Sequence, residues 1–280
     1  MTQNHYIQLA KEYMESNYLD GWLIYDYRHR NPALSHILGP VSMVTRPIFL
    51  WIPKMGEDIL ITHHVDAGRF DKNNLTLQEY SGYDSLKTML KTILSHSNVI
   101  AMEYSPMAEI PRASSVDAGT LELIKSLDVE VGSSANLIQY STQRWTKWQL
   151  QSHLNTAEIL TSTVEKAFKY VSTNINNRPT ESEVADFVLS CINKEGLITP
   201  DGPVVAVGNH SSDPHYIPKV NHDYKINPGS WLLIDLWARE NATNAVFADI
   251  TWVGYVGHSM PDKYRKVFDI VVKARDKAVD

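Results

Sequence analysis

Two acidic residues interrupt two apolar segments late in the chain, and this feature constrains the fold more than any other. Asp235 lies within residues 231–238 and Asp249 within residues 246–256, where the neighbouring side chains are almost all apolar. Aspartate is disfavoured in β-strands, and a carboxylate is costly inside an apolar layer unless a positive group meets it. Two such residues in consecutive predicted strands therefore need a common explanation.

The spacing of the two segments predicts that the aspartates face each other. If the segments pair as an antiparallel hairpin centred on Ala242, Asp235 lies directly opposite Asp249, with Cβ atoms about 5 Å apart. Two carboxylates at that distance must share a proton or a cation. Hard divalent ions such as Mn²⁺ or Mg²⁺ suit oxygen ligands, and the sequence has no Asp-Thr-Gly motif of a proton-sharing dyad. The alternative is that both side chains face solvent or pair with lysine or arginine.

A histidine in the loop before these strands is a second candidate for function. His215 lies in the polar segment 208–218, and loops held by rigid elements frequently carry functional groups. An imidazole titrates near neutral pH and suits a substrate contact or general acid–base catalysis. The alternative is an exposed side chain without a role. Cys191 lies on the apolar face of a predicted helix, and we expect it to be a structural thiol.

The remaining pattern divides the chain near residue 141. Before that point short apolar strands, including a predicted hairpin over residues 48–62, alternate with amphipathic helices, as in an α/β layer. A long amphipathic helix follows, then a helix that begins at a capping box formed by Thr180 and Glu183, and then strands with period-two patterning. We therefore expect an α/β domain over residues 1–141 and an α+β domain over residues 142–280.

Composition disfavours several classes of function. The 32 acidic and 26 basic residues give a net charge of −6, which disfavours a nucleic-acid binder. Apolar runs stay shorter than the ~18 residues of a membrane span, so we expect no membrane partner. A single cysteine and a polar N-terminus without a secretory pattern predict a cytoplasmic protein.

The acidic strands resemble the metal-binding strands of the pita-bread metallopeptidases, which include prolidase, aminopeptidase P and methionine aminopeptidase. The strands with Thr251, and the preceding strand with its loop Asp213-Pro-His-Tyr216, carry this resemblance. The first part of the chain is similar to the creatinase-type N-terminal domain of Xaa-Pro peptidases. That similarity rests on residues 20–26, 31–32, the strand pair around Trp51, 116–120 and 127–131.

The resemblance implies a creatinase-like N-terminal domain over residues 1–141 and the first half of a pita-bread catalytic domain over residues 142–280. It also implies metal-dependent hydrolysis of the peptide bond preceding proline. The family uses two divalent ions, which we expect to be Mn²⁺, with Co²⁺, Zn²⁺ or Mg²⁺ as alternatives. Asp235 and Asp249 match the two aspartate ligands, and His215 matches the histidine that contacts the substrate. The family's remaining ligands, one histidine and two glutamates, match no residue of this sequence.

The implied partner is a proline-containing peptide, and the implied assembly is a homodimer. Two other interpretations stay open. A non-catalytic pita-bread module that binds peptides or proteins is favoured by the three unmatched ligands. A metal-free relative such as creatinase is disfavoured because that branch has no use for paired carboxylates. Half of a catalytic domain would also expose apolar strand and helix faces and would tend to self-associate.

Overall fold

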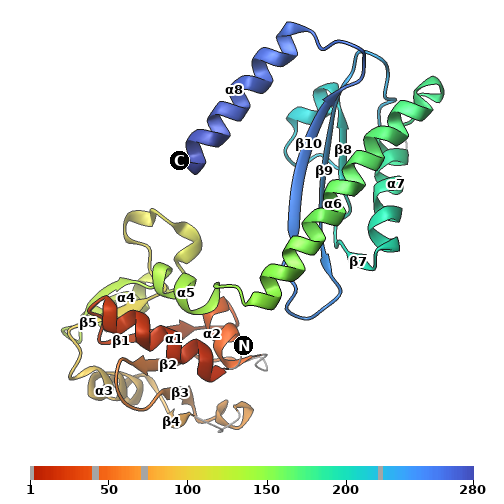
Figure 1. The fold of residues 1–280 in the computed structure, drawn as a ribbon. Helices are drawn as coiled ribbons and strands as arrows, with labels where there is room; N and C mark the ends of the chain where they lie inside the picture. Colours follow the sequence, from red (N-terminus) through yellow and green to blue (C-terminus); the bar gives the residue numbers. More distant parts are fainter. Residues whose placement is uncertain (1–2, 40–43, 71–74, 220–222) are drawn as a thin grey trace. The chain divides into compact units, whose positions relative to one another are not determined.

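The computed structural model describes residues 3–39, 44–70, 75–219 and 223–280. The chain divides into two compact units, Met1–Arg144 and Trp145–Asp280 (Figure 1). None of the described helices combines the length and the apolar character that crossing a bilayer requires.

Unit 1 is built on a six-stranded mixed sheet. Strand β2 pairs antiparallel with β1 and β3, whereas the pairs β3–β4, β1–β5 and β5–β6 are parallel. The predicted hairpin over residues 48–62 is thereby confirmed as β2 and β3. In spatial order the strands are β4 (Thr76–Tyr80), β3 (Ile59–His63), β2 (Ile48–Pro53), β1 (Gly21–Asp26), β5 (Val99–Met102) and β6 (Glu130–Ser133).

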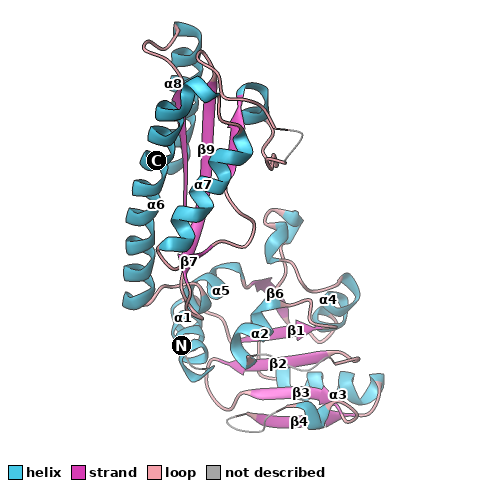
Figure 2. Cartoon of the chain, turned by 90° about the vertical axis from the view of Figure 1, so that its right-hand side faces the viewer, coloured by secondary structure: helices cyan, strands magenta, loops and turns pink. Residues whose placement is uncertain are grey.

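Helices cover both faces of this sheet (Figure 2). One face packs against α1 (Gln3–Ser16), α2 (Pro32–Leu38) and α5 (Ala135–Thr142), and the other against α3 (Tyr83–Leu94) and α4 (Ala118–Lys125). Successive side chains of a strand point to opposite faces. All six residues of β1 are buried, as expected for a strand enclosed between two helical layers.

Unit 2 contains a smaller antiparallel sheet and, among its described residues, three α-helices. Strand β9 (Trp231–Glu240) pairs with β10 (Ala248–Tyr255) along one edge. Along its other edge it pairs with β8 (Val204–Val207) and with the two-residue strand β7 (Leu197–Ile198). The helices are α6 (Lys147–Asn174), α7 (Glu181–Lys194) and the C-terminal α8 (Asp262–Val279). The capping box predicted at Thr180 and Glu183 is present at the start of α7.

The sheet of unit 2 is buried on one face only. Alternate residues of β9 are fully buried in the core formed with α6 and α7, namely Leu232, Ile234, Leu236 and Ala238. The residues between them, including Leu233, Asp235 and Trp237, are half-buried on the opposite face. We call this opposite side of β9 and β10 the open face. It is the face on which the acidic side chains lie.

Candidate metal centre

Asp235 and Asp249 lie on the same face of the β9–β10 hairpin. Asp235 is paired with Thr251, and Asp249 is paired with Trp237. Paired residues of an antiparallel ladder share a face, and Thr251 is two residues from Asp249, so all four side chains project from the open face. Period-two patterning of the sequence therefore placed the two acids correctly with respect to the sheet.

The predicted register is wrong by two residues. The hairpin is centred on Thr243 and not on Ala242, so Asp235 is diagonal to Asp249 and not opposite to it. Two contacts explain why β9 extends to Glu240, beyond the predicted segment 231–238. Strand β7 pairs with Arg239 and Glu240 and keeps them in the ladder. The guanidinium of Arg239 also donates hydrogen bonds to the carbonyls of Glu240 and Ala242, at 3.1 and 2.8 Å, which holds the turn.

The two carboxylates are not neutralised by any basic side chain among the described residues. The hydroxyl of Thr251 donates a 2.5 Å hydrogen bond to Oδ1 of Asp235. Desolvation raises the pKa of Asp249, and the negative charge of Asp235 raises it further. Two like charges that disfavour each other's ionised form are a site at which a cation would be stabilised. Carboxylate oxygens fit a hard divalent ion.

The acidic pair supplies only part of a metal site. In residues 3–39, 44–70, 75–219 and 223–280 there is no group of three or more histidine, cysteine or acidic side chains arranged to hold a metal ion. A pair of ions that acts in hydrolysis must be held about 3.5–4 Å apart, which requires more ligands than two carboxylates. The two carboxylates are therefore suitable donors for a divalent cation, but they are fewer than a site for two ions requires.

His215 lies in the loop that follows β8 and the short helix η5 (Gly208–Ser212). Its side chain is exposed, and its backbone N–H donates to Oδ1 of Asp213 at 2.9 Å in a tight turn. Within the described part of the chain, its ring makes no hydrogen bond to either aspartate. The loop leaves β8 beside Leu232, three residues from Asp235 along β9. The structure therefore brings the two acids together and places His215 in a neighbouring loop.

The pattern of the sequence did not reveal a buried carboxylate beside this loop. Glu181, the first residue of α7, is 0% exposed and hydrogen-bonds to residues on both sides of the His215 loop. An acidic residue in the first turn of a helix is normally explained by the helix dipole and an exposed position. No feature of its sequence context distinguishes Glu181 from such a residue.

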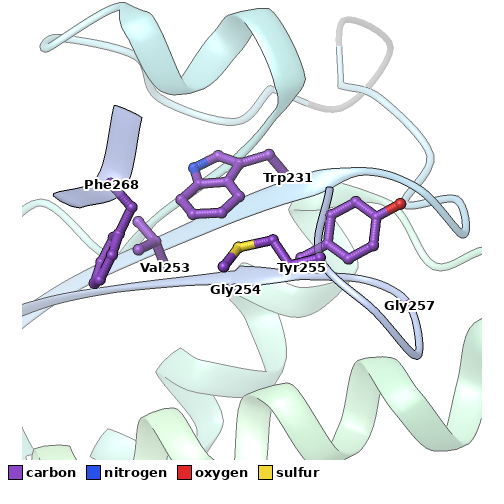
Figure 3. Close-up of a pocket in the computed structure, with 7 residues that line it drawn as sticks. Trp231, Val253, Gly254, Tyr255, Gly257 and Phe268 are labelled. Atoms are coloured by element: carbon purple, nitrogen blue, oxygen red, sulfur yellow. The ribbon is translucent and has the colours of Figure 1, made fainter. Parts of the chain in front are cut away.

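The other end of the open face is apolar. A hollow of about 320 Å³ lies there between the sheet and α8 (Figure 3). The ring of Trp231 stacks on that of Tyr264 of α8, with centroids 5.5 Å apart. The open face thus has an acidic half and an apolar half. The hollow is lined by Trp231, Val253, Gly254, Tyr255, Gly257, Met260 and Phe268.

Several solved structures with a similar fold are described as dipeptidases or prolidases. The Pyrococcus horikoshii OT3 prolidase is 21% identical, with a TM-score of 0.53 over 98% of this chain and 71% of that chain. The dipeptidase PepE from Mycobacterium ulcerans is 16% identical, with a TM-score of 0.62 over 94% of this chain and 67% of that chain. The Xaa-Pro dipeptidase from Bacillus anthracis is 16% identical, with a TM-score of 0.55 over 98% and 70% of the two chains. These similarities establish the fold, a mixed α/β architecture with two sheets.

The sequence itself gives a narrower assignment. No curated protein sequence matches this chain significantly. Residues 156–280 match the sequence model of Metallopeptidase family M24. This match includes the whole β9–β10 hairpin and both of its aspartates, so the second part of the chain is similar to metallopeptidase family M24.

Proposed function

We propose that this chain acts in the metal-dependent hydrolysis of the peptide bond that precedes proline. The observation that carries the proposal is the pair Asp235 and Asp249, which share the open face without a basic partner among the described residues. They lie within the segment that matches family M24. Prolidases and an Xaa-Pro dipeptidase are among the structures with a similar fold, which supports proline-containing peptides as substrates.

In this proposal the two aspartates hold divalent metal, for which Mn²⁺ is the first candidate because the donors are hard oxygens. The bound metal supplies Lewis-acid activation of water and of the scissile carbonyl. The hydroxyl of Thr251 occupies Oδ1 of Asp235 and so fixes the rotation of that carboxylate. The exposed imidazole of His215 donates a hydrogen bond to the substrate carbonyl, where negative charge develops during hydrolysis.

The same proposal extends to the organisation of the chain. Residues 142–280 form the first half of a pita-bread catalytic domain, and residues 1–141 form a creatinase-like N-terminal domain. Asp235 and Asp249 are two of the five ligands that such a domain uses. Assembly as a homodimer completes the proposal, and light scattering on the purified protein tests it.

Calorimetric titration with MnCl₂ tests the ligand role directly. We expect Asp235→Asn and Asp249→Asn each to lower the affinity for Mn²⁺ by about tenfold or more, because each removes one charged ligand. Asp201→Asn is the matched control, since Asp201 is an exposed aspartate of the same unit without a described hydrogen bond or ion pair. In the Mn²⁺-loaded protein, release of proline from the dipeptide Ala-Pro should fall together with the affinity. Unchanged Mn²⁺ affinity in both variants would refute the ligand role.

A non-catalytic peptide-binding module is the second candidate function. It is favoured by the observation that no third metal-binding side chain joins the two aspartates within the described residues. Such a module would bind Ala-Pro equally well in EDTA and in Mn²⁺ and would release no proline. A peptidase would release proline only with the metal, so a single assay under both conditions separates the two functions.

A further inference from the structure

Glu181 accepts hydrogen bonds from four groups although its side chain is completely buried. Its Oε1 accepts from the backbone N–H of Val207 at 2.7 Å, and its Oε2 accepts from the backbone N–H of Tyr224 at 2.8 Å. The ring of His210 and the hydroxyl of Tyr216 approach the same carboxylate at 2.9 and 2.6 Å. A buried carboxylate without such donors would be strongly destabilising. Here both oxygens are satisfied.

The aromatic rings around Glu181 form a stack. The ring of His210 lies between those of Tyr216 and Tyr224, at centroid distances of 4.2 and 3.9 Å and with interplanar angles of 27° and 23°. Burial raises the pKa of Tyr216, and its hydrogen bond to Glu181 and the charge of Glu181 raise the pKa further. The phenol of Tyr216 therefore keeps its proton and remains a donor to the carboxylate.

These contacts surround the loop that carries His215. Val207 is the last residue of β8, before the loop, and Tyr224 follows the loop on the way to β9. Within the loop, Tyr216 is half-buried against Glu181, whereas the preceding residue, His215, is exposed. One carboxylate thus contacts the chain before, within and after the loop.

We propose that Glu181 is a positioning residue that holds the His215 loop in one conformation and so presents the His215 imidazole at a fixed place. The loop is held through Tyr216 and His210, and its ends are held through the amides of Val207 and Tyr224. The part of the proposal that concerns substrate rests on the proposed function. The part that concerns the order of the loop does not.

The chemistry of the site makes Glu181→Gln a sharp test. Glutamine has the size of glutamate, but one of its two terminal atoms is an NH₂ group, which only donates. Each oxygen of Glu181 accepts from a backbone N–H, and a backbone N–H cannot become an acceptor. In either orientation the glutamine amide therefore faces a donor and leaves a buried group unsatisfied.

Tyr216→Phe and Tyr224→Phe form a matched pair for the loop. Both substitutions keep an aromatic ring against His210, but only the hydroxyl of Tyr216 bonds to Glu181. In amide hydrogen exchange on the whole chain, we expect residues 208–218 to exchange about tenfold faster or more in Glu181→Gln and about threefold faster in Tyr216→Phe. Tyr224→Phe should leave this segment unchanged, and the amides of β9 and β10 should be unchanged in all three variants.

A second measurement separates positioning from a general effect on folding. Glu181→Gln and Tyr216→Phe leave the aspartates intact, so both should bind Mn²⁺ with the affinity of the unaltered protein. Their affinity for the dipeptide Ala-Pro, titrated in Mn²⁺, should fall by about fivefold or more, as expected when a binding group is no longer held in place. Should Glu181→Gln fail to fold, Tyr216→Phe alone carries both measurements.

Two results would overturn the proposal. One is faster exchange spread evenly over unit 2, or equal exchange of residues 208–218 in Tyr216→Phe and Tyr224→Phe. The other is Ala-Pro affinity that is unchanged in Tyr216→Phe and in a folded Glu181→Gln. If the unaltered protein binds no Ala-Pro, the proposed function fails on that point, and the exchange measurement still decides whether Glu181 orders the loop.

Discussion

One pair of acidic residues in each unit shows how the two sheets differ. The sheet of unit 1 has helices on both faces, and Asp26, at the end of β1, and Glu103, directly after β5, are 1% and 2% exposed. The sheet of unit 2 has helices on one face, and Asp235 and Asp249 lie on the other. Enclosed acids must find their donors within the fold. Acids on an open face can leave their oxygens to a ligand, which is the role that we propose for Asp235 and Asp249.

The enclosed acids of unit 1 are fully engaged. Glu103 accepts hydrogen bonds from Nε1 of Trp22, Nδ2 of Asn31 and the hydroxyl of Ser134, at 2.7, 2.5 and 2.9 Å. Burial raises the pKa of Glu103, and these three donors act in the opposite direction. Asp26 accepts from three consecutive backbone N–H groups at residues 29–31. Both carboxylates thus tie the sheet to the chain that enters α2, and Glu103 also reaches the start of α5.

The largest predicted effect is that of Glu103→Ala. The substitution leaves three buried donors without an acceptor and opens a cavity, and we expect the free energy of unfolding to fall by about 4 kcal/mol. Urea denaturation monitored by circular dichroism measures this loss. A loss below about 1 kcal/mol would mean that water replaces the carboxylate, and the contrast between the two sheets would then be weaker than we describe.

A smaller effect on the free energy of unfolding is expected when one glycine in each unit is replaced by alanine. A Cβ atom at Gly21 of β1 would lie 2.0 Å from the ring of Trp51, which is 4% exposed and cannot move aside. A Cβ atom at Gly254 of β10 would lie 2.7 Å from the half-buried ring of Phe168. We expect Gly21→Ala to cost about 3 kcal/mol and Gly254→Ala about 1 kcal/mol, measured by urea denaturation. Equal costs would show that the two cores yield equally to overpacking.

Local sequence patterns predicted the elements whose stability is largely local. The hairpin predicted over residues 48–62 agrees with β2 and β3, and the long helix and the capping box are present. The patterns did not predict α2, β4, α5 and β7, each of which has eight residues or fewer.

The candidate site shows the same division between local and tertiary information. The alternation of side chains along a strand predicted that Asp235 and Asp249 share one face. This property does not change when the pairing of the two strands shifts by two residues. The register of the hairpin is supported by β7, a two-residue strand that pairs with β9. Because β7 is distant in sequence from the hairpin, the residues of the hairpin alone did not predict the register. Glu181 was missed for the same reason, since its donors come from segments 26 to 43 residues away.

The acidic pair of unit 2 should respond to substitution with the opposite sign from Glu103. Without metal, Asp249→Asn removes a repulsion, and we expect the free energy of unfolding to rise by less than about 1 kcal/mol, because solvent screens these partly exposed groups. Urea denaturation in EDTA measures this change. Added Mn²⁺ should reverse the order and stabilise the unaltered protein more than the variant, because ligand binding favours the folded state. A loss of stability of Asp249→Asn in EDTA would contradict a repulsion between the two carboxylates.

The last predicted effect is confined to high pH and concerns two of the chain's 14 tyrosines, both in the sheet of unit 1. Burial raises the pKa of Tyr25 on β1 and of Tyr80 on β4 to about 12, from an ordinary value of 10.0. The folded chain then keeps these protons while the unfolded chain loses them, so the free energy of unfolding should fall as the pH rises from 10 towards 12. Phenolate absorbance should show a late component that Tyr25→Phe and Tyr80→Phe each reduce. If both variants keep the full late component, these phenols titrate as exposed groups and this sheet is less closed to solvent than its packing indicates.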